Sequence, residues 1–356
     1  MGGQETTAER RNGSRAAAAI TPVFLLSVPR AGSTLVQRVL GAHDGVATAA
    51  EPWLLLPALL PLRKPMPLAP GWYQTMAGAV REFVAELPDG THSYREALRA
   101  FAERLYAEAA PPGARFFLDK SPAYHLVADD VIRTFPNARF VFLWRSPLSV
   151  LASTVETFCD GRWRPGSHRG DLFNGVTNLV HAYEQAGDRA HSVRYEDLLT
   201  RGDEPWQALA SYVGVDFDPA ALRRFADVEL AGSMGDPTGR LRYAALDREP
   251  LEKWRETISN PLRREWAIRY LRWLGRRRLA VMGYDLDAMI EELEAVQVRR
   301  SGLRRDAVDV VSALGRDVAR GRTPGIASAS RALLAPHAAG RRGGARGRLG
   351  SRSRGS

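Results

Sequence analysis

The sequence predicts an α/β fold in which a central parallel β-sheet is flanked by helices in three α/β/α layers. Two observations predict it. Short apolar runs, too short for helices, alternate along the chain with stretches that carry apolar residues at helical spacing. In addition, polar clusters directly follow four of these runs, and the carboxyl ends of the strands form the ligand-binding edge of such sheets.

The expected strands are continuous apolar runs, which is typical of strands buried on both faces of a parallel sheet. They are residues 23–28, 116–118, 139–144 and 192–195. Stretches with apolar residues at helical spacing lie between and after these runs. The expected helices cover residues 33–40, 72–87, 94–109, 123–135, 147–157, 172–187, 206–212, 263–282 and 286–296.

Charge divides the chain into a folded body and two flanking segments. The 356 residues carry a net charge of +10, but residues 297–356 hold fourteen arginines against three aspartates, so the body is almost neutral. We expect a disordered leader over residues 1–20, one folded domain over 21–297 and a basic Arg/Gly/Ser/Ala-rich tail over 298–356. Apolar residues from Leu303 to Val318 predict an amphipathic helix in that tail.

Composition excludes several classes of protein. The single Cys159 excludes a disulfide framework or a thiolate metal cluster within the chain. No apolar run approaches the roughly 18 residues of a membrane-spanning helix, and none near the start resembles a signal peptide. Of the 50 basic residues only Lys64, Lys120 and Lys253 are lysines, which is typical of a GC-rich bacterial genome. We therefore expect a soluble, cytoplasmic bacterial protein without a metal site.

The segment between the first strand and its helix predicts a P-loop-like phosphate cradle. Gly32 lets the backbone approach a ligand, Ser33 and Thr34 supply donors at a helix N-terminus, and Arg30 adds positive charge. The Gly-Lys-Ser/Thr ending of a Walker A loop is absent. The alternative is an ordinary strand–turn–helix with a serine cap.

A second anion site is predicted after the third strand. Arg145 ends that strand and Ser153 follows eight residues later. If Pro147 begins a helix, Ser149 and Ser153 share one face of it, and a guanidinium with a hydroxyl can grip a phosphate. The alternative is a surface arginine beside a capping Ser146.

Two further residues suit acid–base and charge-stabilising roles. Glu51 lies between a stretch of small residues and an apolar run, which suits a general base; the alternative is a glutamate favoured by a helix dipole. Lys120 follows the second strand and can neutralise charge on a leaving group. Its alternative is an ion pair with Asp119 or another carboxylate.

These segments resemble the PAPS-dependent sulfotransferases, and in particular the bacterial branch similar to tyrosylprotein sulfotransferases (PAPS is 3′-phosphoadenosine 5′-phosphosulfate). Residues 29–35 resemble the loop that binds the 5′-phosphosulfate, residues 140–153 the strand and helix that bind the 3′-phosphate, and residues 194–198 the Arg-Tyr-Glu-Asp-Leu segment. Residues 42–57 and 119–122 resemble the His-Pro-x-Val…Glu-Pro stretch and the Asp/Glu-Lys-Ser/Thr-Pro motif of that branch.

The resemblance implies transfer of a sulfuryl group from PAPS, the co-substrate, to an acceptor hydroxyl or, less often, an amine. Glu51 stands in the place of the catalytic base and Lys120 in that of a lysine near the bridging oxygen, and no metal is required. By position, the residues that would bind the donor are Arg30, Ala31, Gly32, Ser33 and Thr34 at the 5′-phosphosulfate and Arg145, Ser153 and Tyr195 at the 3′-phosphate.

The chain departs from the cytosolic branch of these enzymes in three places. That branch uses a lysine where this loop has Arg30, and a histidine where this chain has Pro122. His125 lies too far along to replace that histidine, so the base is expected at Glu51. The cytosolic branch also has a glycine-rich loop that closes over the nucleotide. Residues 232–240 of this chain are a loose counterpart, in which Ser233 or Arg240 is expected to contact the nucleotide.

The acceptor is left open among small molecules, carbohydrates, lipids and peptides. The helical insertion of residues 53–110 should shape the acceptor side, and the loop of residues 160–166, with Trp163, is a second candidate. For the basic tail we expect docking or disorder first and weak contact with anionic membranes second. No specific nucleic-acid partner is expected, because no nucleic-acid-binding motif accompanies the arginines.

Two other functions compete with the sulfotransferase. A P-loop-type kinase of small molecules fits the cradle, but the missing Walker lysine counts against it. A non-catalytic nucleotide-binding protein on the same scaffold is the second, and the presence of Glu51, Lys120, Arg145 and Ser153 counts against that.

Overall fold

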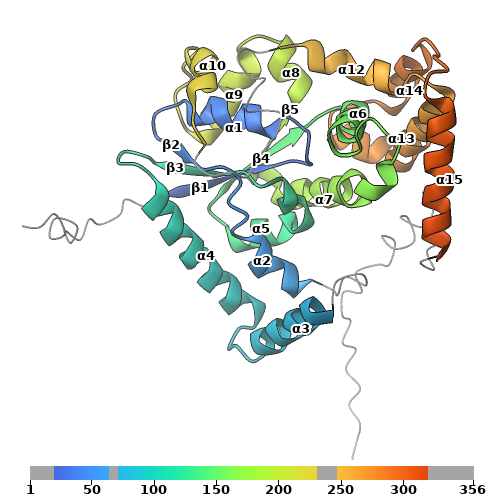
Figure 1. The fold of residues 1–356 in the computed structure, drawn as a ribbon. Coiled ribbons are helices and arrows are strands. Elements are labelled where there is room, and N and C mark those ends of the chain that lie inside the picture. Colours follow the sequence, from blue (N-terminus) through green and yellow to red (C-terminus); the bar gives the residue numbers. More distant parts are fainter. Residues whose placement is uncertain (1–19, 64–70, 231–246, 320–356) are drawn as a thin grey trace, which may run out of the picture.

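Five parallel strands form the central sheet of this protein (Figure 1). The computed structural model describes residues 20–63, 71–230 and 247–319. The sheet order is β2-β3-β1-β4-β5, and every neighbouring pair is parallel. The strands are β1 (Thr21–Leu26), β2 (Val46–Thr48), β3 (Phe116–Asp119), β4 (Arg139–Trp144) and β5 (Ala190–Arg194). The predicted α/β fold class is confirmed.

The apolar runs identified in the sequence form the centre of this sheet. In β1 and β4 every residue after the first is buried, because helices cover both faces. The sequence prediction lacks β2, a three-residue edge strand without an apolar run. The side chain of Thr48 anchors β2 by donating to the carbonyl of Leu118 at 2.8 Å. The prediction is also wrong at Tyr195, which begins a helix instead of ending β5.

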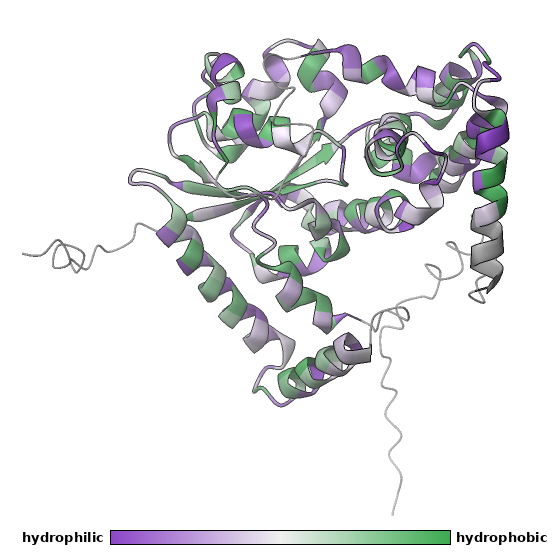
Figure 2. Cartoon of the chain, in the orientation of Figure 1, coloured by the Kyte–Doolittle hydropathy of each residue, from purple (hydrophilic) through white to green (hydrophobic). Residues whose placement is uncertain are grey.

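Helices cover both faces of the sheet (Figure 1). One face carries α1 (Ser33–Gly41), α8 (Tyr195–Thr200), α9 (Glu204–Val213), α10 (Ala221–Arg224) and the short η7 (Phe225–Asp227). The other face carries α4 (Thr91–Ala109), η3 (Pro122–Leu126), α5 (Ala128–Thr134), α7 (Val176–Ala186) and the short η6 (Gly187–Arg189). Figure 2 shows that hydrophobic residues are concentrated in the strands and in the helix faces turned toward them. The core therefore lies within these three layers.

Further helices lie beyond the carboxyl ends of the strands. They are α6 (Pro147–Phe158), η4 (Pro165–His168), η5 (Gly170–Gly175), α12 (Glu249–Thr257), α13 (Pro261–Val281), α14 (Leu286–Glu294) and α15 (Leu303–Ala319). Helices α6 and α12 pack against each other, as do α13 and α14. This group of helices stands where α/β proteins bind their ligands.

The predicted insertion separates β2 from β3. It consists of α2 (Leu56–Leu59), η2 (Leu60–Leu62), α3 (Gly71–Ala85) and α4. Helices α3 and α4 form a hairpin that projects away from the sheet (Figure 1). Tyr106 of α4 reaches back into the core, where its ring stacks on Phe117 of β3 at 4.5 Å. Among the described helices, none has both the length and the apolar character needed to cross a bilayer.

Candidate active site

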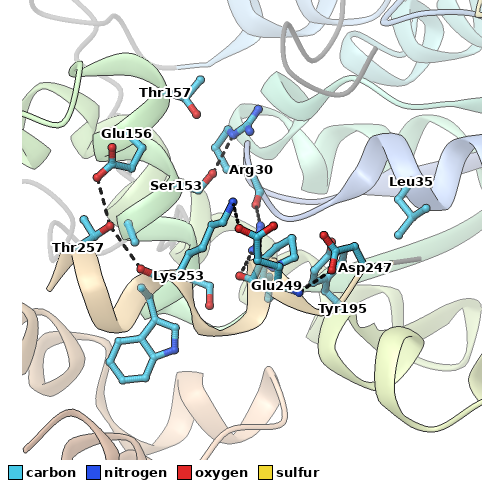
Figure 3. Close-up of a pocket in the computed structure, with 15 residues that line it drawn as sticks. Arg30, Leu35, Ser153, Glu156, Thr157, Tyr195, Asp247, Glu249, Lys253 and Thr257 are labelled. Atoms are coloured by element: carbon cyan, nitrogen blue, oxygen red, sulfur yellow. Dashed lines mark hydrogen bonds and ion pairs between the residues drawn. The ribbon is translucent and has the colours of Figure 1, made fainter. Parts of the chain in front are cut away.

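The predicted polar clusters meet at the carboxyl edge of the sheet around two cavities. The first cavity, of about 490 Å³, lies between α6 and α12, and we call it the α6–α12 cavity (Figure 3). The second, of about 410 Å³, opens beside Glu51, and we call it the Glu51 cavity. Arg30 lines both cavities. The two spaces therefore adjoin at the loop that follows β1.

That loop is shaped so tightly that only glycine fits at its centre. Gly32 has φ of 94° and stands immediately before α1. A Cβ atom at this position would lie 2.3 Å from Cε2 of Tyr195, so the tyrosine ring occupies the space that any other side chain needs. Ser33 and Thr34 follow at the N-terminus of α1 and line the Glu51 cavity, while Ala31 is fully buried in the turn. The geometry is that of an anion cradle.

Arg145 is fixed against this loop from the next strand. Its Nη1 donates to the carbonyl of Arg30 at 2.8 Å, and its Nη2 donates to the carbonyl of Pro250 at 2.9 Å. The guanidinium carbon lies 4.7 Å from the centre of the Tyr195 ring. The Nε atom is buried and has no hydrogen-bond partner among the described residues, so Arg145 retains a donor.

Ser153 lies on α6 within the same cavity, as the spacing of eight residues from Arg145 predicts. It accepts a hydrogen bond from Nε of Arg30 at 3.1 Å, so here its partner is Arg30 rather than Arg145 (Figure 3). Helix α12 forms the opposite wall, where Lys253 pairs with Glu249 at 2.8 Å. No sequence motif predicts this wall, although the rarity of lysine in the chain is a signal for Lys253.

Glu51 and Lys120 form an ion pair at the edge of the Glu51 cavity. Nζ of Lys120 lies 2.8 Å from Oε1 of Glu51, and Nε1 of Trp53 donates to Oε2 at 3.2 Å. The lysine side chain is 1% exposed and the glutamate 12%. A buried ammonium needs a partner, and here the partner is Glu51 and not the neighbouring Asp119. The two predicted catalytic residues are thus in direct contact.

Asp119 instead ties the Glu51 segment to the core. It is fully buried and accepts hydrogen bonds from the hydroxyls of Tyr106 at 2.6 Å, Tyr124 at 2.9 Å and Ser121 at 3.3 Å. Burial raises its pKa to about 6, although these hydrogen bonds and Lys120 oppose the rise. Ser121 Oγ in turn accepts from the backbone N–H of Trp53 at 3.1 Å. Asp119 therefore helps to place the chain beside Glu51.

Backbone strain is concentrated around the two cavities. Among the described residues, three that are not glycine have a positive φ: Arg30 at 68°, Trp53 at 54° and Asp160 at 52°. Arg30 and Trp53 line the Glu51 cavity, and Asp160 follows Phe158, which also lines it. Such conformations cost roughly 1–3 kcal/mol each and are typical of functional sites.

His125 lines the Glu51 cavity, and its ring is held by neighbouring parts of the protein. Its Nε2 lies 2.9 Å from Oδ1 of Asp171. Its Nδ1 faces the backbone of Gly175, where a Cβ atom would lie 3.0 Å away. Both ring nitrogens are thus directed at the protein. Two carboxylates, Glu51 and Asp171, line the same cavity.

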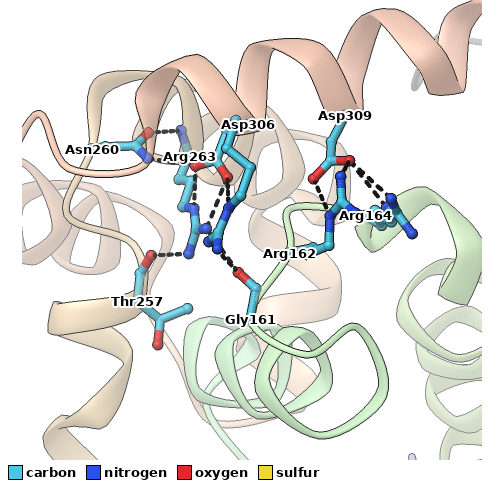
Figure 4. Close-up of polar contacts among 9 residues, drawn as sticks. Gly161, Arg162, Arg164, Thr257, Asn260, Arg263, Asp306 and Asp309 are labelled. Carbon is cyan, nitrogen blue, oxygen red and sulfur yellow. Dashed lines mark hydrogen bonds and ion pairs between the residues drawn. The ribbon is translucent and has the colours of Figure 1, made fainter.

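In the loop of residues 160–166, Trp163 is buried and lines neither of the two cavities, so the expectation that its side chain contacts an acceptor is wrong. The arginines on either side of it hold helix α15 (Figure 4). Nη2 of Arg162 lies 2.6 Å from Asp309, and Nη2 of Arg164 lies 3.1 Å from the same carboxylate. Because Asp309 is buried, its ion pairs with Arg162 and Arg164 hold α15 on the body of the protein.

A second buried aspartate completes the attachment of α15. Asp306 accepts from Nε and Nη2 of Arg263 at 2.6 and 2.9 Å, and from the amide of Asn260 at 2.6 Å (Figure 4). Arg263 also donates to the carbonyls of Gly161 and Thr257, and Thr257 lines the α6–α12 cavity. The beginning of the basic tail is thus packed on the body beside the site.

Arg240 and residues 232–240 lie outside the described residues, so the expected nucleotide contact there stays a prediction. Within the described part of the chain, no three His, Cys, Asp or Glu side chains gather in a way that could hold a metal ion. The other predicted site residues all follow strands of the sheet: Arg30, Ala31, Gly32, Ser33 and Thr34 follow β1, Glu51 follows β2, Lys120 follows β3, Arg145 and Ser153 follow β4, and Tyr195 follows β5.

A glycine-containing turn before a helix, a stacked arginine and an acid–lysine pair meet at the carboxyl edge of the parallel sheet in this α/β protein. Comparison with known proteins identifies the class further. Residues 22–219 match the model of the sulfotransferase family, which is more than half of the chain. The chain therefore belongs to the sulfotransferase family, as the sequence motifs predict.

Two curated relatives and one solved structure illustrate the similarity. The chain is 30% identical over 262 residues to nodulation protein NoeE of Sinorhizobium fredii, covering 66% of this chain and 60% of that protein. It is 23% identical over 277 residues to the protein-tyrosine sulfotransferase of Drosophila melanogaster, covering 74% and 51%. The match thus spans between half and two thirds of these relatives.

The solved structure is the sulfotransferase domain from the curacin biosynthetic pathway. It superposes with a TM-score of 0.51 at 22% identity and covers 75% of this chain and 98% of that domain. This similarity bears on the fold.

Proposed function

We propose that this protein transfers a sulfuryl group from PAPS to an acceptor hydroxyl. The observation that carries the proposal is the meeting of two cavities at Arg30, with Arg145 and Tyr195 on one side and the Glu51–Lys120 pair on the other. Family membership supports a sulfonate donor such as PAPS.

The residues around the two adjoining cavities suit the two anionic ends of PAPS, with Gly32, Ser33 and Thr34 on the Glu51 cavity and Arg145 and Ser153 on the α6–α12 cavity. The cradle at Gly32 suits the 5′-phosphosulfate, because the backbone N–H groups of Ser33 and Thr34 begin α1 and favour an anion there. The unpartnered, buried Nε of Arg145 and the hydroxyl of Ser153 suit the 3′-phosphate. PAPS supplies the sulfuryl group as a phosphosulfate anhydride.

In the proposed reaction Glu51 acts as the general base and Lys120 stabilises the charge of the leaving group. Glu51 accepts the proton of the acceptor hydroxyl as its oxygen forms a bond to sulfur. The bond between sulfur and the bridging oxygen breaks, and its electron pair stays on the 5′-phosphate, so that the products are a sulfate ester and adenosine 3′,5′-bisphosphate. Lys120 and Arg30 neutralise the charge that develops on that oxygen. Positioning and electrostatics carry such transfers, as in phosphoryl transfer.

The buried ion pair between Glu51 and Lys120 links these two roles. Lys120 is held 2.8 Å from Glu51 at rest, and proton transfer to Glu51 removes the charge that holds it. The lysine is then available to the leaving oxygen at the moment when charge appears there. The core contacts of Asp119 and Ser121 keep the Glu51 segment in place meanwhile.

Label transfer tests this function directly. Wild-type protein and Glu51→Gln are incubated with ³⁵S-labelled PAPS and a panel of phenols, alcohols and amino sugars, and labelled products are separated. We expect a labelled product from the wild type and a rate lower by about 10²–10⁴-fold for the variant. Transfer from ³²P-labelled ATP in place of PAPS would support a kinase and contradict the proposal.

A further inference from the structure

The Glu51 cavity contains a second carboxylate that the proposed reaction does not use. Asp171 lines the cavity from η5, whereas Glu51 reaches it from the segment after β2. The Asp171 side chain is 32% exposed. It is therefore open to a molecule in the cavity, unlike the fully buried Asp119.

The charge of Asp171 is only weakly balanced. Its ion-pair partners among the described residues are histidines: His125 at 2.9 Å and His168 at 3.7 Å. Burial favours the protonated acid, but the hydrogen bond and charge of His125, with the charge of His168, hold the pKa of Asp171 below its usual value. By contrast, Lys120 neutralises Glu51, and Arg30 faces both cavities. The acceptor side thus presents an ionised carboxylate without a lysine or arginine partner among the described residues.

The backbone at Asp171 is unusual. Residues 170–175 form a single turn of π-helix immediately before α7. Such turns are rare and are frequent at functional sites. The turn places Asp171 on the cavity while Leu172 and Phe173 remain buried.

The rest of the cavity is suited to a flat apolar body. Trp53 and Phe158 line it and are among the exposed large hydrophobic side chains of the protein, at 37% and 46%. Leu56 and Leu126 add aliphatic surface. Aromatic rings exposed beside a cavity commonly cover the faces of a bound ring.

On the basis of the proposed function, we propose that the acceptor is a small aromatic hydroxyl compound that carries a cationic group, and that Asp171 binds this cation. An acceptor with an acidic group is disfavoured by the same carboxylate. Asp171 thereby acts as a specificity-determining residue, and His125 orients it through Nε2.

Three phenols of similar size and different charge provide the test: tyramine (cationic), 4-ethylphenol (neutral) and 3-(4-hydroxyphenyl)propionate (anionic). Each is titrated by calorimetry into protein saturated with adenosine 3′,5′-bisphosphate. For the wild type we expect tyramine to bind about 5- to 10-fold more tightly than 4-ethylphenol, since a partly exposed ion pair contributes about 1 kcal/mol. The propionate should bind most weakly.

Variants identify the carboxylate responsible. In Asp171→Asn the preference of tyramine over 4-ethylphenol should fall to within about 2-fold, and in Asp171→Glu it should persist. Asp188→Asn, which changes an exposed aspartate in the same way, should behave as the wild type. If Asp171→Asn fails to fold, the order of the three phenols on the wild type still decides whether the acceptor is cationic, and Asp171→Glu, which keeps the charge, then tests whether the preference depends on this side chain.

The outcomes separate this inference from the proposed function. Binding of the bisphosphate without any order among the phenols, or with the propionate tightest, overturns the role of Asp171 alone. Saturation by none of the three at millimolar concentration overturns the aromatic acceptor. Failure of the bisphosphate itself to bind contradicts the proposed function, and the phenols are then titrated into the free protein, where the same order is expected.

Discussion

Replacing Gly32 with alanine tests how closely the cradle and Tyr195 fit together. The added Cβ would lie 2.3 Å from Cε2 and 2.4 Å from Cδ2 of the Tyr195 ring, more than 1 Å inside an ordinary contact. The residue must also keep φ at 94°, which costs alanine about 1–2 kcal/mol. Overpacking adds about 1–3 kcal/mol. The free energy of unfolding should therefore fall by about 2–5 kcal/mol.

The assay is urea denaturation followed by circular dichroism, with Gly78→Ala as the matched control. Gly78 lies within α3 with open space around it, so the same chemical change should stabilise the protein by about 1 kcal/mol. The double variant Gly32→Ala/Tyr195→Leu should lose less stability than the two single variants lose together, because the smaller leucine relieves the clash with the new Cβ. A Gly32→Ala protein within 0.5 kcal/mol of the wild type would refute the reasoning.

Two further predictions concern the buried aspartates. Because burial raises the pKa of Asp119 from 3.8 to about 6, its contribution to stability is present below pH 3.8 and is lost as the pH rises through 6. Between about pH 4 and pH 7 the wild type should therefore lose about 2 kcal/mol relative to Asp119→Asn, measured by urea denaturation at each pH. An equal pH dependence of the two proteins would contradict this. Asp306→Ala leaves Arg263 buried without its carboxylate and should lower the free energy of unfolding by about 3–5 kcal/mol. The control Asp188→Ala, at an exposed aspartate, should change it by less than about 0.5 kcal/mol. Equal effects in the two variants would disprove the role of Asp306 in docking α15.

The sheet could be predicted because its strands are buried on both faces and leave apolar runs in the sequence. Residues 139–144 show this most clearly, since the expected and observed limits coincide. Strand β2 has no such run, because it is an edge strand of three small residues, one of which is held by a side-chain hydrogen bond. Tyr195 does not extend β5, because it begins α8, where its ring packs against Gly32.

Residues of the site could be predicted where they directly follow a strand, since topology alone then brings them to one edge. Arg30, Lys120 and Arg145 are of this kind. Other contacts could not be predicted, because the two residues come from distant elements and only packing brings them together. Examples are the contacts of Asp119 with Tyr106 and of Arg162 with Asp309. Asp171 was missed for the same reason: its place on the Glu51 cavity depends on a π-helical turn that no sequence pattern marks.

Titration of adenosine 3′,5′-bisphosphate by calorimetry tests the central claim most directly. The ligand carries the 3′-phosphate that distinguishes PAPS from ATP, and Arg145 offers the buried donor for it. We expect tight binding by the wild type, weaker binding by at least about 30-fold for Arg145→Ala, and unchanged binding for Arg223→Ala, an exposed arginine. ATP should bind much more weakly than the bisphosphate. Absence of binding, or equal affinity for ATP, would contradict a PAPS-dependent sulfotransferase.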